Sequence, residues 1–294
     1  MPPFRLSLAP AAWLLANCGA CSCYSSSGAD PHVGMVRIPA GPVLIGSDWS
    51  ACPYDSPLHE VAVSAFYIDV FEATNEEHKA CVAAGACRRP VLSSSLTRAD
   101  YYDSAAFAHY PVVGMDAWSD AHDYCAWRGK RLPTEAEWEK AARGGCEREG
   151  EAGTCDRFAD ARDYPWVGLE ASCLWGNVAP DCAGGDTAAV GAFPRDVSPY
   201  GVRDMGGNVR ESVSDYFLAD YYAVSARSDP QGPTEEEARG RCPDMPVGAV
   251  CHVVRGDSFG GSVSDESGGL PLTCRSAASR INPDVGVRCA LDAL

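Results

Sequence analysis

Two short stretches in the first half of the chain have helical character. The first covers residues 76–84 and ends at Gly85, a residue type that commonly terminates helices. The second covers residues 120–128, follows Ser119, whose hydroxyl can cap a helix, and ends at Gly129. Helical spacing gives the second stretch an apolar inner face, made by Ala121, Tyr124 and Cys125.

Residues 134–143 carry the most complete helix signal in the chain. Thr134 can accept from the free amides of the first turn, and Glu137 can reach back to the amide of the cap. Pro133 keeps the preceding chain extended, and the glycine pair at residues 144–145 ends the helix. Charged residues follow the helix dipole, with Glu135, Glu137 and Glu139 before Lys140 and Arg143. On these features alone, we expect a well-capped helix on the surface.

The rest of the chain shows less periodicity. Residues 61–70 alternate loosely and are rich in β-branched and aromatic types, which predicts one strand. From residue 144 onward, frequent glycine and proline predict long, irregular loops. Residues 218–252 include the acidic run Glu235-Glu236-Glu237 and are expected to form a surface excursion. The pattern predicts a mixed, loop-rich fold without internal repeats.

Composition and charge narrow the classes of function. The chain has 294 residues, of which 46% are hydrophobic, so it can bury a sizeable core. Its net charge of −16 argues against nucleic-acid binding, which needs a basic surface.

Fifteen cysteines are more than a reduced cytosolic protein usually carries. Their spacing lacks the Cys-x-x-Cys and histidine pattern of zinc sites. Disulfides in an exported protein explain them better, and four short-range pairs stand out: Cys81 with Cys87, Cys146 with Cys155, Cys173 with Cys182, and Cys242 with Cys251.

The N-terminus is consistent with export to the periplasm or the cell surface. Residues 6–16 form an apolar segment after Arg5, and it is too short to span a membrane. Residues 15–18 approximate a bacterial lipoprotein processing box that would lipidate Cys18 and tether the protein to a membrane, whereas an ordinary signal peptide would be cleaved near Ala20. Both routes remain open, and both make residues 1–20 a leader and residues 21–34 a flexible tether.

Residues 129–139, Gly-Lys-Arg-Leu-Pro-Thr-Glu-Ala-Glu-Trp-Glu, resemble the central signature of the sulfatase-modifying-factor family, the formylglycine-generating enzymes and their relatives. Further blocks of this family follow in order, at residues 35–41, 45–47, 66–69, 72–75, 110–115, 200–209, 254–259 and 286–290. The resemblance implies one domain over residues 35–292. Its expected fold is a loop-rich α+β variant of the C-type lectin-like fold, with little regular secondary structure and several disulfides.

The same resemblance raises doubt about catalysis. Family enzymes oxidise a substrate cysteine with oxygen and a copper ion, which two cysteines hold after a Gly-Gly-Ser-aromatic block. Soft thiolates select Cu(I). Here that block contains Ser258, and the two cysteine positions carry Gly261 and Glu266. Arg210 also replaces the tryptophan of the Asn-x-Trp-Glu motif. We therefore assign no catalytic residue and expect no bound copper.

Calcium binding is also implied by the resemblance. Asp204, Gly207, Val209 and Glu211 match one family calcium site, with two carboxylates and two carbonyls that suit a hard cation. The ligand positions of a second family site fall, by ungapped alignment, on Cys173 and Cys182. We hypothesise that a disulfide between them has replaced that metal.

The family also indicates how the remaining cysteines pair. Cys125 and Cys289 match a long-range structural disulfide of family members. Cys52 and Cys274 are then left, and they are paired only by elimination.

Two functional hypotheses remain. The first is a non-catalytic, exported domain that binds an unidentified ligand or protein, such as a peptide. The second is an active oxidase that converts a sulfatase cysteine to formylglycine.

Overall fold

The computed structural model describes residues 32–50, 52–149, 154–166, 171–243, 245–261, 269–278 and 281–293. His32–Leu294 forms one compact unit. The expected leader (1–20), Cys18, most of the tether (21–34) and Glu266 lie outside the described residues. Among the described residues, no helix is both long enough and apolar enough to cross a membrane.

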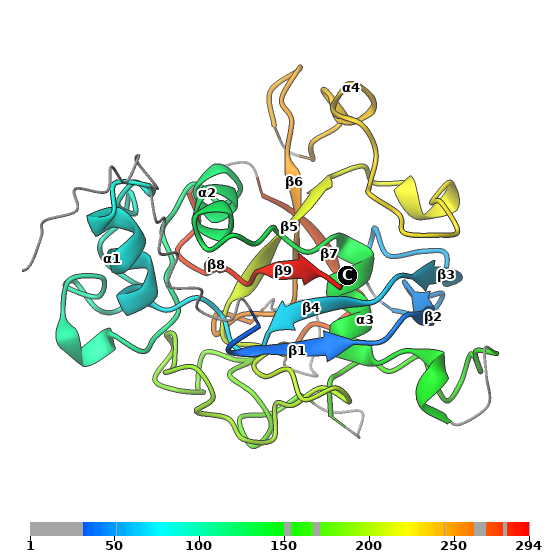
Figure 1. Cartoon of the computed structure of the whole chain (residues 1–294), viewed down its shortest axis with the longest axis horizontal. Coiled ribbons are helices and arrows are strands. Elements are labelled where there is room, and N and C mark those ends of the chain that lie inside the picture. Colours follow the sequence, from blue (N-terminus) through cyan, green and yellow to red (C-terminus); the bar gives the residue numbers. More distant parts are fainter. Residues whose placement is uncertain are drawn as a thin grey trace, which may run out of the picture. The chain divides into compact units, whose positions relative to one another are not determined.

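The described strands form three small sheets (Figure 1). One sheet has the order β1-β4-β9, with β1 at Met35–Ile38, β4 at Phe66–Asp69 and β9 at Ala290–Asp292. A two-stranded sheet pairs β2, Gly41–Ile45, with β3, His59–Val63. The third has the order β7-β6-β5-β8, at Arg275–Ala278, His252–Arg255, Arg210–Tyr216 and Val285–Val287. All ladders are antiparallel except the parallel pair β5 and β8.

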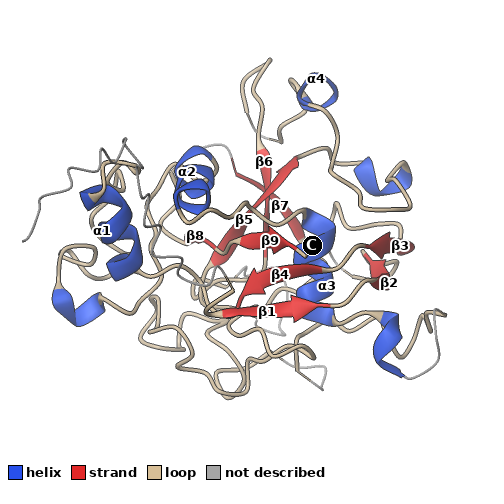
Figure 2. Cartoon of the chain, in the orientation of Figure 1, coloured by secondary structure: helices blue, strands red, loops and turns tan. Residues whose placement is uncertain are grey.

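Short helices and long loops make up the rest of the described chain (Figure 2). The α-helices are α1 at Asn75–Ala83, α2 at Ser119–Trp127, α3 at Glu135–Arg143 and α4 at Glu235–Ala238. Three 3₁₀ turns lie at Ala105–Phe107, Cys146–Glu149 and Tyr221–Ala223. The expected class, α+β with little regular secondary structure, is confirmed.

Two local predictions were wrong. Residues 61–70 form parts of two strands, because β3 pairs with β2 whereas β4 pairs with β1 and β9. Ser119 is the first residue of α2 and not its cap; Trp118 takes the cap position without a side-chain hydrogen bond. The Ser119 hydroxyl donates instead to Asp116, at 2.9 Å.

The α3 helix has the predicted bounds and capping box, but it does not lie on the surface. All of its residues are buried, and it packs against β2, β3, β5 and β6. Its charges therefore do more than follow the helix dipole, because a buried charge needs a partner. Residues 218–252 also contribute to the core, through Tyr221, Tyr222, Ala238, Cys242 and Cys251, so they are not a simple surface excursion.

Six disulfides hold the loops, and all six expected pairs are present. Cys125–Cys289 joins α2 to the chain just before β9, and Cys52–Cys274 links segments 222 residues apart. The short-range pairs are Cys81–Cys87, Cys146–Cys155, Cys173–Cys182 and Cys242–Cys251. Each cysteine in the described part of the chain is thus in a disulfide.

Candidate functional site

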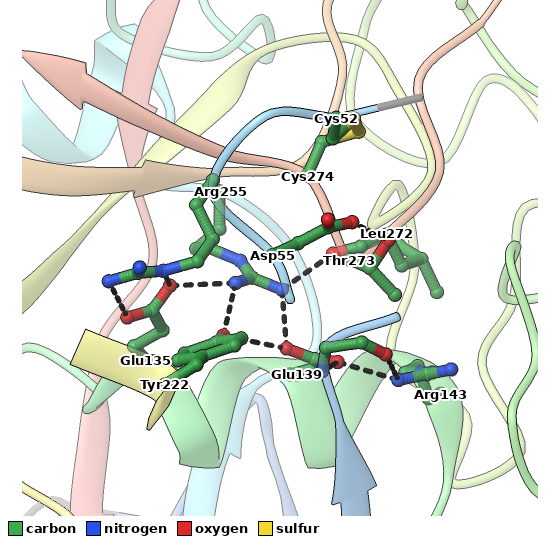
Figure 3. A network of polar contacts seen from close by, with 12 residues as sticks. Cys52, Asp55, Glu135, Glu139, Arg143, Tyr222, Arg255, Leu272, Thr273 and Cys274 are labelled. Carbon is green, nitrogen blue, oxygen red and sulfur yellow. Dashed lines mark hydrogen bonds and ion pairs between the residues drawn. A yellow bond between two sulfur atoms is a disulfide. The ribbon is translucent and has the colours of Figure 1, made fainter. Parts of the chain in front are cut away.

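Glu135 and Glu139, on the inner face of α3, anchor a buried ion network (Figure 3). Arg255, at the end of β6, bridges the two carboxylates at 2.7 Å each. Arg275, at the start of β7, donates to both oxygens of Glu135, at 2.6 and 2.9 Å. Arg143 donates to the other oxygen of Glu139 at 2.7 Å. The signature helix is therefore tied to two strands of the largest sheet.

Both carboxylates of the network are fully paired, because each accepts hydrogen bonds from two guanidinium groups. Burial alone would raise the pKa of Glu135, but Arg275 and Arg255 hold that pKa below its ordinary value. Tyr222 completes the network by donating to Glu139 at 3.1 Å while accepting from Arg255 at 2.9 Å. This arrangement explains why the signature needs charges on a buried helix: they hold the scaffold together.

Arg210, Asp284 and Ser258 lie together, and the resemblance places Arg210 and Ser258 at the family's oxidation site. Arg210 is the first residue of β5, and Asp284 immediately precedes β8. The two strands pair in parallel. The guanidinium donates to both carboxylate oxygens of Asp284, at 2.9 and 3.1 Å. Ser258 Oγ donates to the same carboxylate at 3.1 Å. The cation predicted to have replaced a tryptophan is thus paired with an anion and a hydroxyl.

Gly261 follows Ser258 by three residues, and its surroundings leave little room for a side chain. Its φ is +55°, a conformation that L side chains rarely adopt, and an added Cβ would lie 3.2 Å from the carbonyl oxygen of Val178. Glu266, the other expected position, lies outside the described residues. Neighbouring Asp257 accepts from the amides of Ser258 and Leu270, and burial raises its pKa to about 7. None of the described residues here offers a free thiol for copper.

The four residues predicted to bind calcium belong to one tight turn that leads into β5. Asp204 has φ +60°, a left-handed conformation that aspartate tolerates better than most residues. Gly207 packs so closely that an added Cβ would lie 2.7 Å from the carbonyl oxygen of Asn177. Val209 is buried, and Glu211 follows on β5. Along the chain, the two carboxyl residues therefore flank the two residues whose carbonyls are expected to bind calcium.

Glu211 has strong partners already. Arg288 donates to both of its oxygens, with contacts of 2.7 to 3.1 Å, and Trp138 of α3 donates through Nε1 at 2.7 Å. Asp204 accepts from the amide of Gly191 at 2.5 Å. The signature helix therefore reaches this turn through its buried tryptophan.

Further carboxyl groups surround the turn. Glu72 and Asp196 are buried with Asp204 and Glu211, and Arg288 is the guanidinium that contacts this carboxyl cluster. Burial and the neighbouring acids raise the pKa of Glu72 and that of Asp196 well above their usual values. Burial also raises the pKa of Asp204, to about 6. Four buried carboxyl groups thus lie near one guanidinium, and their oxygens are of the type that a hard divalent cation such as calcium accepts.

The described residues line two cavities, of which the first reaches Glu72 of the carboxyl cluster. One, of about 310 Å³, is lined by Glu72, Asp69, Phe71, Tyr124 and Arg128, among others. The second, of about 380 Å³, is lined by Trp118, His122, Arg131, Ser214 and Asp292, among others. Both have the volume of a small-ligand site.

Comparisons with known proteins agree with this architecture. The model of the Sulfatase-modifying factor enzyme 1-like domain family matches residues 24–293, and the chain therefore belongs to this family. The formylglycine-generating enzyme of Thermomonospora curvata is 30% identical over 70% of this chain and 80% of its own. The inactive C-alpha-formylglycine-generating enzyme 2 of Bos taurus is 32% identical over 64% of this chain and 73% of its own.

Other relatives differ in length or match in fold only. The serine/threonine-protein kinase pkn1 of Chlamydia caviae is 30% identical over 87% of this chain, which spans only 37% of that kinase. The structure of PvdO from Pseudomonas aeruginosa superimposes with a TM-score of 0.64 at 24% identity, covering 88% of this chain and 94% of that one. The relatives that match this chain therefore carry different names: a formylglycine-generating enzyme, an inactive one and a protein kinase.

Sequence reasoning missed the partners of the residues that it singled out. Asp284 was not considered, although a lone acid shortly before the closing Gly-Val-Arg block is a possible partner for Arg210. The motif blocks contain Glu72, Glu135, Glu139 and Arg288, but nothing in their spacing along the chain shows which charges meet.

Proposed function

We propose that this protein is an exported, non-catalytic member of the sulfatase-modifying-factor family that binds a ligand or a protein. The domain keeps the family's scaffold, including the signature helix and its ion network. At the oxidation site, a charged pair and a glycine stand where family enzymes use an aromatic ring and a thiol. A relative of similar length that is named inactive shows that the family includes such members.

One observation carries the proposal: Asp284 engages both Arg210 and Ser258. The side chains of Arg210 and Asp284 are about a fifth to a quarter exposed, so both the guanidinium and the carboxylate can contact a ligand. Such a pair can recognise a peptide backbone or a polar ligand through charge-assisted hydrogen bonds. It cannot clamp Cu(I), which prefers thiolates.

Calcium is part of the proposal as a structural ion. Asp204, Glu211 and the carbonyls of Gly207 and Val209 would hold it, and the burial of Glu72 and Asp196 near the same turn supports an oxygen-rich site there. When bound, calcium supplies positive charge to a buried turn. The turn leads directly into Arg210, so the ion would stabilise the strand that carries the binding pair. The Cys173–Cys182 disulfide is proposed to stabilise the neighbouring loop in place of a second ion.

Export is supported by six disulfides, which persist mainly in oxidising compartments. Lipidation of Cys18 stays a proposal. Expression of the full chain with Cys18→Ser, followed by cell fractionation and mass analysis, tests it. Lipidation predicts that the substitution removes both the acyl mass and the membrane association. If the substitution changes neither the membrane association nor the acyl content of the protein, the alternative of an ordinary signal peptide is supported.

A peptide assay tests the loss of catalysis. Protein with intact disulfides is loaded with copper and incubated in air with a Cys-x-Pro-x-Arg peptide, beside the Thermomonospora enzyme as positive control. We expect the peptide mass to stay unchanged with this protein. A mass loss that matches thiol-to-aldehyde conversion would establish the alternative, an active oxidase, and would overturn the proposal.

Binding is tested separately, by fluorescence anisotropy of peptides and by screening small polar ligands. Asp284→Asn is the diagnostic variant, because it removes the charge of the pair but keeps its shape. We expect it to weaken any ligand that uses the pair. A ligand whose affinity is unchanged by this substitution binds elsewhere, and the assignment of this site would then be wrong.

A further inference from the structure

Cys52, Cys274 and Asp55 form a compact group of potential metal ligands that shares no residue with the carboxyl cluster. One ligand atom of each, two sulfurs and a carboxylate oxygen, lies within 4.8 Å of the others. Cys274 and Asp55 are buried, whereas Cys52 is partly exposed. Figure 3 shows the disulfide beside Asp55 and above the ion network of α3. This group plays no part in the proposed ligand-binding role.

Hydrogen bonds from both chain segments fix the position of the carboxylate. Ser50 Oγ donates to Asp55 Oδ2 at 2.5 Å, and Thr273, adjacent to Cys274, donates to the same oxygen at 2.7 Å. Ser50 Oγ also accepts from the amide of Cys52, at 3.0 Å. The two sulfurs and the carboxylate are thus positioned by one shared set of contacts.

The second carboxylate oxygen remains available. Both hydrogen bonds that the described residues donate to the Asp55 side chain reach Oδ2, and none reaches Oδ1. Because partly exposed Cys52 opens the group on one side, water can supply a fourth ligand. Two thiolates, one carboxylate and one water make a tetrahedral set suited to Zn²⁺.

We propose that Cys52, Asp55 and Cys274 form a redox-controlled zinc site. In the disulfide form, the two sulfurs are bonded to each other and bind no metal. A dithiol or phosphine reductant supplies two electrons, breaks the S–S bond and is itself oxidised, leaving two thiols. Zinc then binds both sulfurs as thiolates and Oδ1 of Asp55, and two thiol protons are released. The link between the two chain segments is kept, by metal in place of the disulfide.

A second group provides an internal comparison. Cys173, Cys182 and Asp181 also bring three ligand atoms within 4.8 Å, but Cys173 and Asp181 are exposed. The contact that the structure gives the Asp181 side chain is with Cys173 itself, at 3.7 Å. In contrast, Asp55 is held from both sides. We therefore expect the buried group to bind zinc more tightly.

The experiment uses the full chain with Cys173→Ser and Cys182→Ser, which removes the exposed group. This parent protein is fully reduced with a phosphine, and its zinc uptake is measured by competition with a chromophoric chelator. Three variants are compared with it: Cys52→Ser with Cys274→Ser, Asp55→Asn alone, and Cys81→Ser with Cys87→Ser. The last is the matched control, because it also removes two disulfide thiols but has no carboxylate in such a group among the described residues.

We expect the parent and the Cys81/Cys87 control to bind about one tight zinc ion, and the Cys52/Cys274 variant to lose it. Asp55→Asn, which keeps all thiols, should weaken binding by at least about tenfold, a loss that even supporting residues of zinc sites produce. Equal loss in the Cys81/Cys87 control would mean that the loss is not specific to the proposed site, and unchanged zinc binding in the Cys52/Cys274 variant would mean that other thiols suffice; either result would refute the proposal. Unchanged zinc affinity in Asp55→Asn would also refute it. Zinc uptake by the parent before reduction would contradict the redox control.

Discussion

Two groups of buried charged residues differ in their ratio of acidic to basic side chains. The ion network of α3 has two carboxylates, Glu135 and Glu139, and three guanidiniums, those of Arg143, Arg255 and Arg275. The carboxyl cluster, defined by Glu72, Asp196, Asp204 and Glu211, has Arg288 as its contacting guanidinium. The network has more guanidiniums than carboxylates, whereas the cluster has more carboxyl groups than guanidiniums in contact with it.

The pKa values reflect this difference. In the network, arginines hold the pKa of Glu135 below its ordinary value despite burial. In the cluster, burial and mutual repulsion raise the pKa values of Glu72 and Asp196. The comparison shows that buried charges in this domain have separate uses. The network holds the scaffold, and the cluster retains the charge that a calcium ion would neutralise.

The largest effect should come from breaking the balanced network. Arg255→Met would leave Glu135 and Glu139 without a shared partner in the core, and we expect a loss of on the order of 5 kcal/mol in unfolding free energy. Urea unfolding measures it. Arg239→Met is the control, because it removes an exposed pair with Glu235 and should cost at most about 0.5 kcal/mol. Similar losses in the two variants would refute the structural role of the network.

The carboxyl group of Asp215 lies beside Glu135, at the edge of the ion network of α3, and its pKa provides a second test. Burial and the charge of Glu135 raise its pKa to about 7, although it accepts from the amide of Glu135 at 2.8 Å. Between pH 4 and 7 the folded state keeps a proton that the unfolded state has released. Stability due to this group is therefore full below pH 4 and falls as the pH rises, by roughly 4 kcal/mol.

Asp215→Asn imitates the protonated carboxyl group and should remove that part of the pH dependence. Urea unfolding of both proteins at a series of pH values provides the measurement. If the two curves stay parallel from pH 4 to 7, Asp215 does not hold a proton in the folded state.

Calcium removal should affect the unbalanced cluster. If the ion binds the folded state alone, calcium at a hundred times its Kd stabilises the protein by about 2.7 kcal/mol, which thermal unfolding with calcium or with chelator measures. Asp204→Asn keeps an oxygen ligand and tolerates the left-handed backbone but removes one charge. It should shift the stabilisation to higher calcium concentrations. Identical melting of the unsubstituted protein in calcium and in chelator would contradict a cation at the cluster.

The smallest effect on stability is expected at the ion pair of Arg210 and Asp284. Asp284→Asn removes half of a partly exposed ion pair, so the unfolding free energy should fall by no more than about 1 kcal/mol. A loss as large as that of Arg255→Met would mean that the pair is structural, which would undermine its proposed role in binding.

The sequence predicted several features well, because they depend on local or chemically specific signals. The bounds of α3 follow from Thr134, Glu137 and the glycines after the helix. The short-range disulfides follow from cysteine spacing, and Cys125–Cys289 follows from the family resemblance. That Gly261 stands where family enzymes have a copper-binding cysteine stays a prediction from the resemblance.

Features that depend on long-range contacts were harder to predict. The burial of α3 was missed because Glu135 and Glu139 are polar, and the arginines of β6 and β7 that pair with them lie more than a hundred residues away. The register of β5 and β8 brings Arg210 to Asp284, and a single sequence contains no signal for that pairing. The loop-rich C-terminal half similarly concealed five strands, because short strands between glycines show little alternation.

The central claim is that the scaffold and its cation site persist, whereas the copper site is lost. Metal analysis of one sample tests both parts. Protein with intact disulfides is equilibrated with calcium and with copper kept cuprous by ascorbate, then desalted and analysed. The account predicts about one calcium ion and no stoichiometric copper per chain. Stoichiometric copper, or copper without calcium, would contradict it.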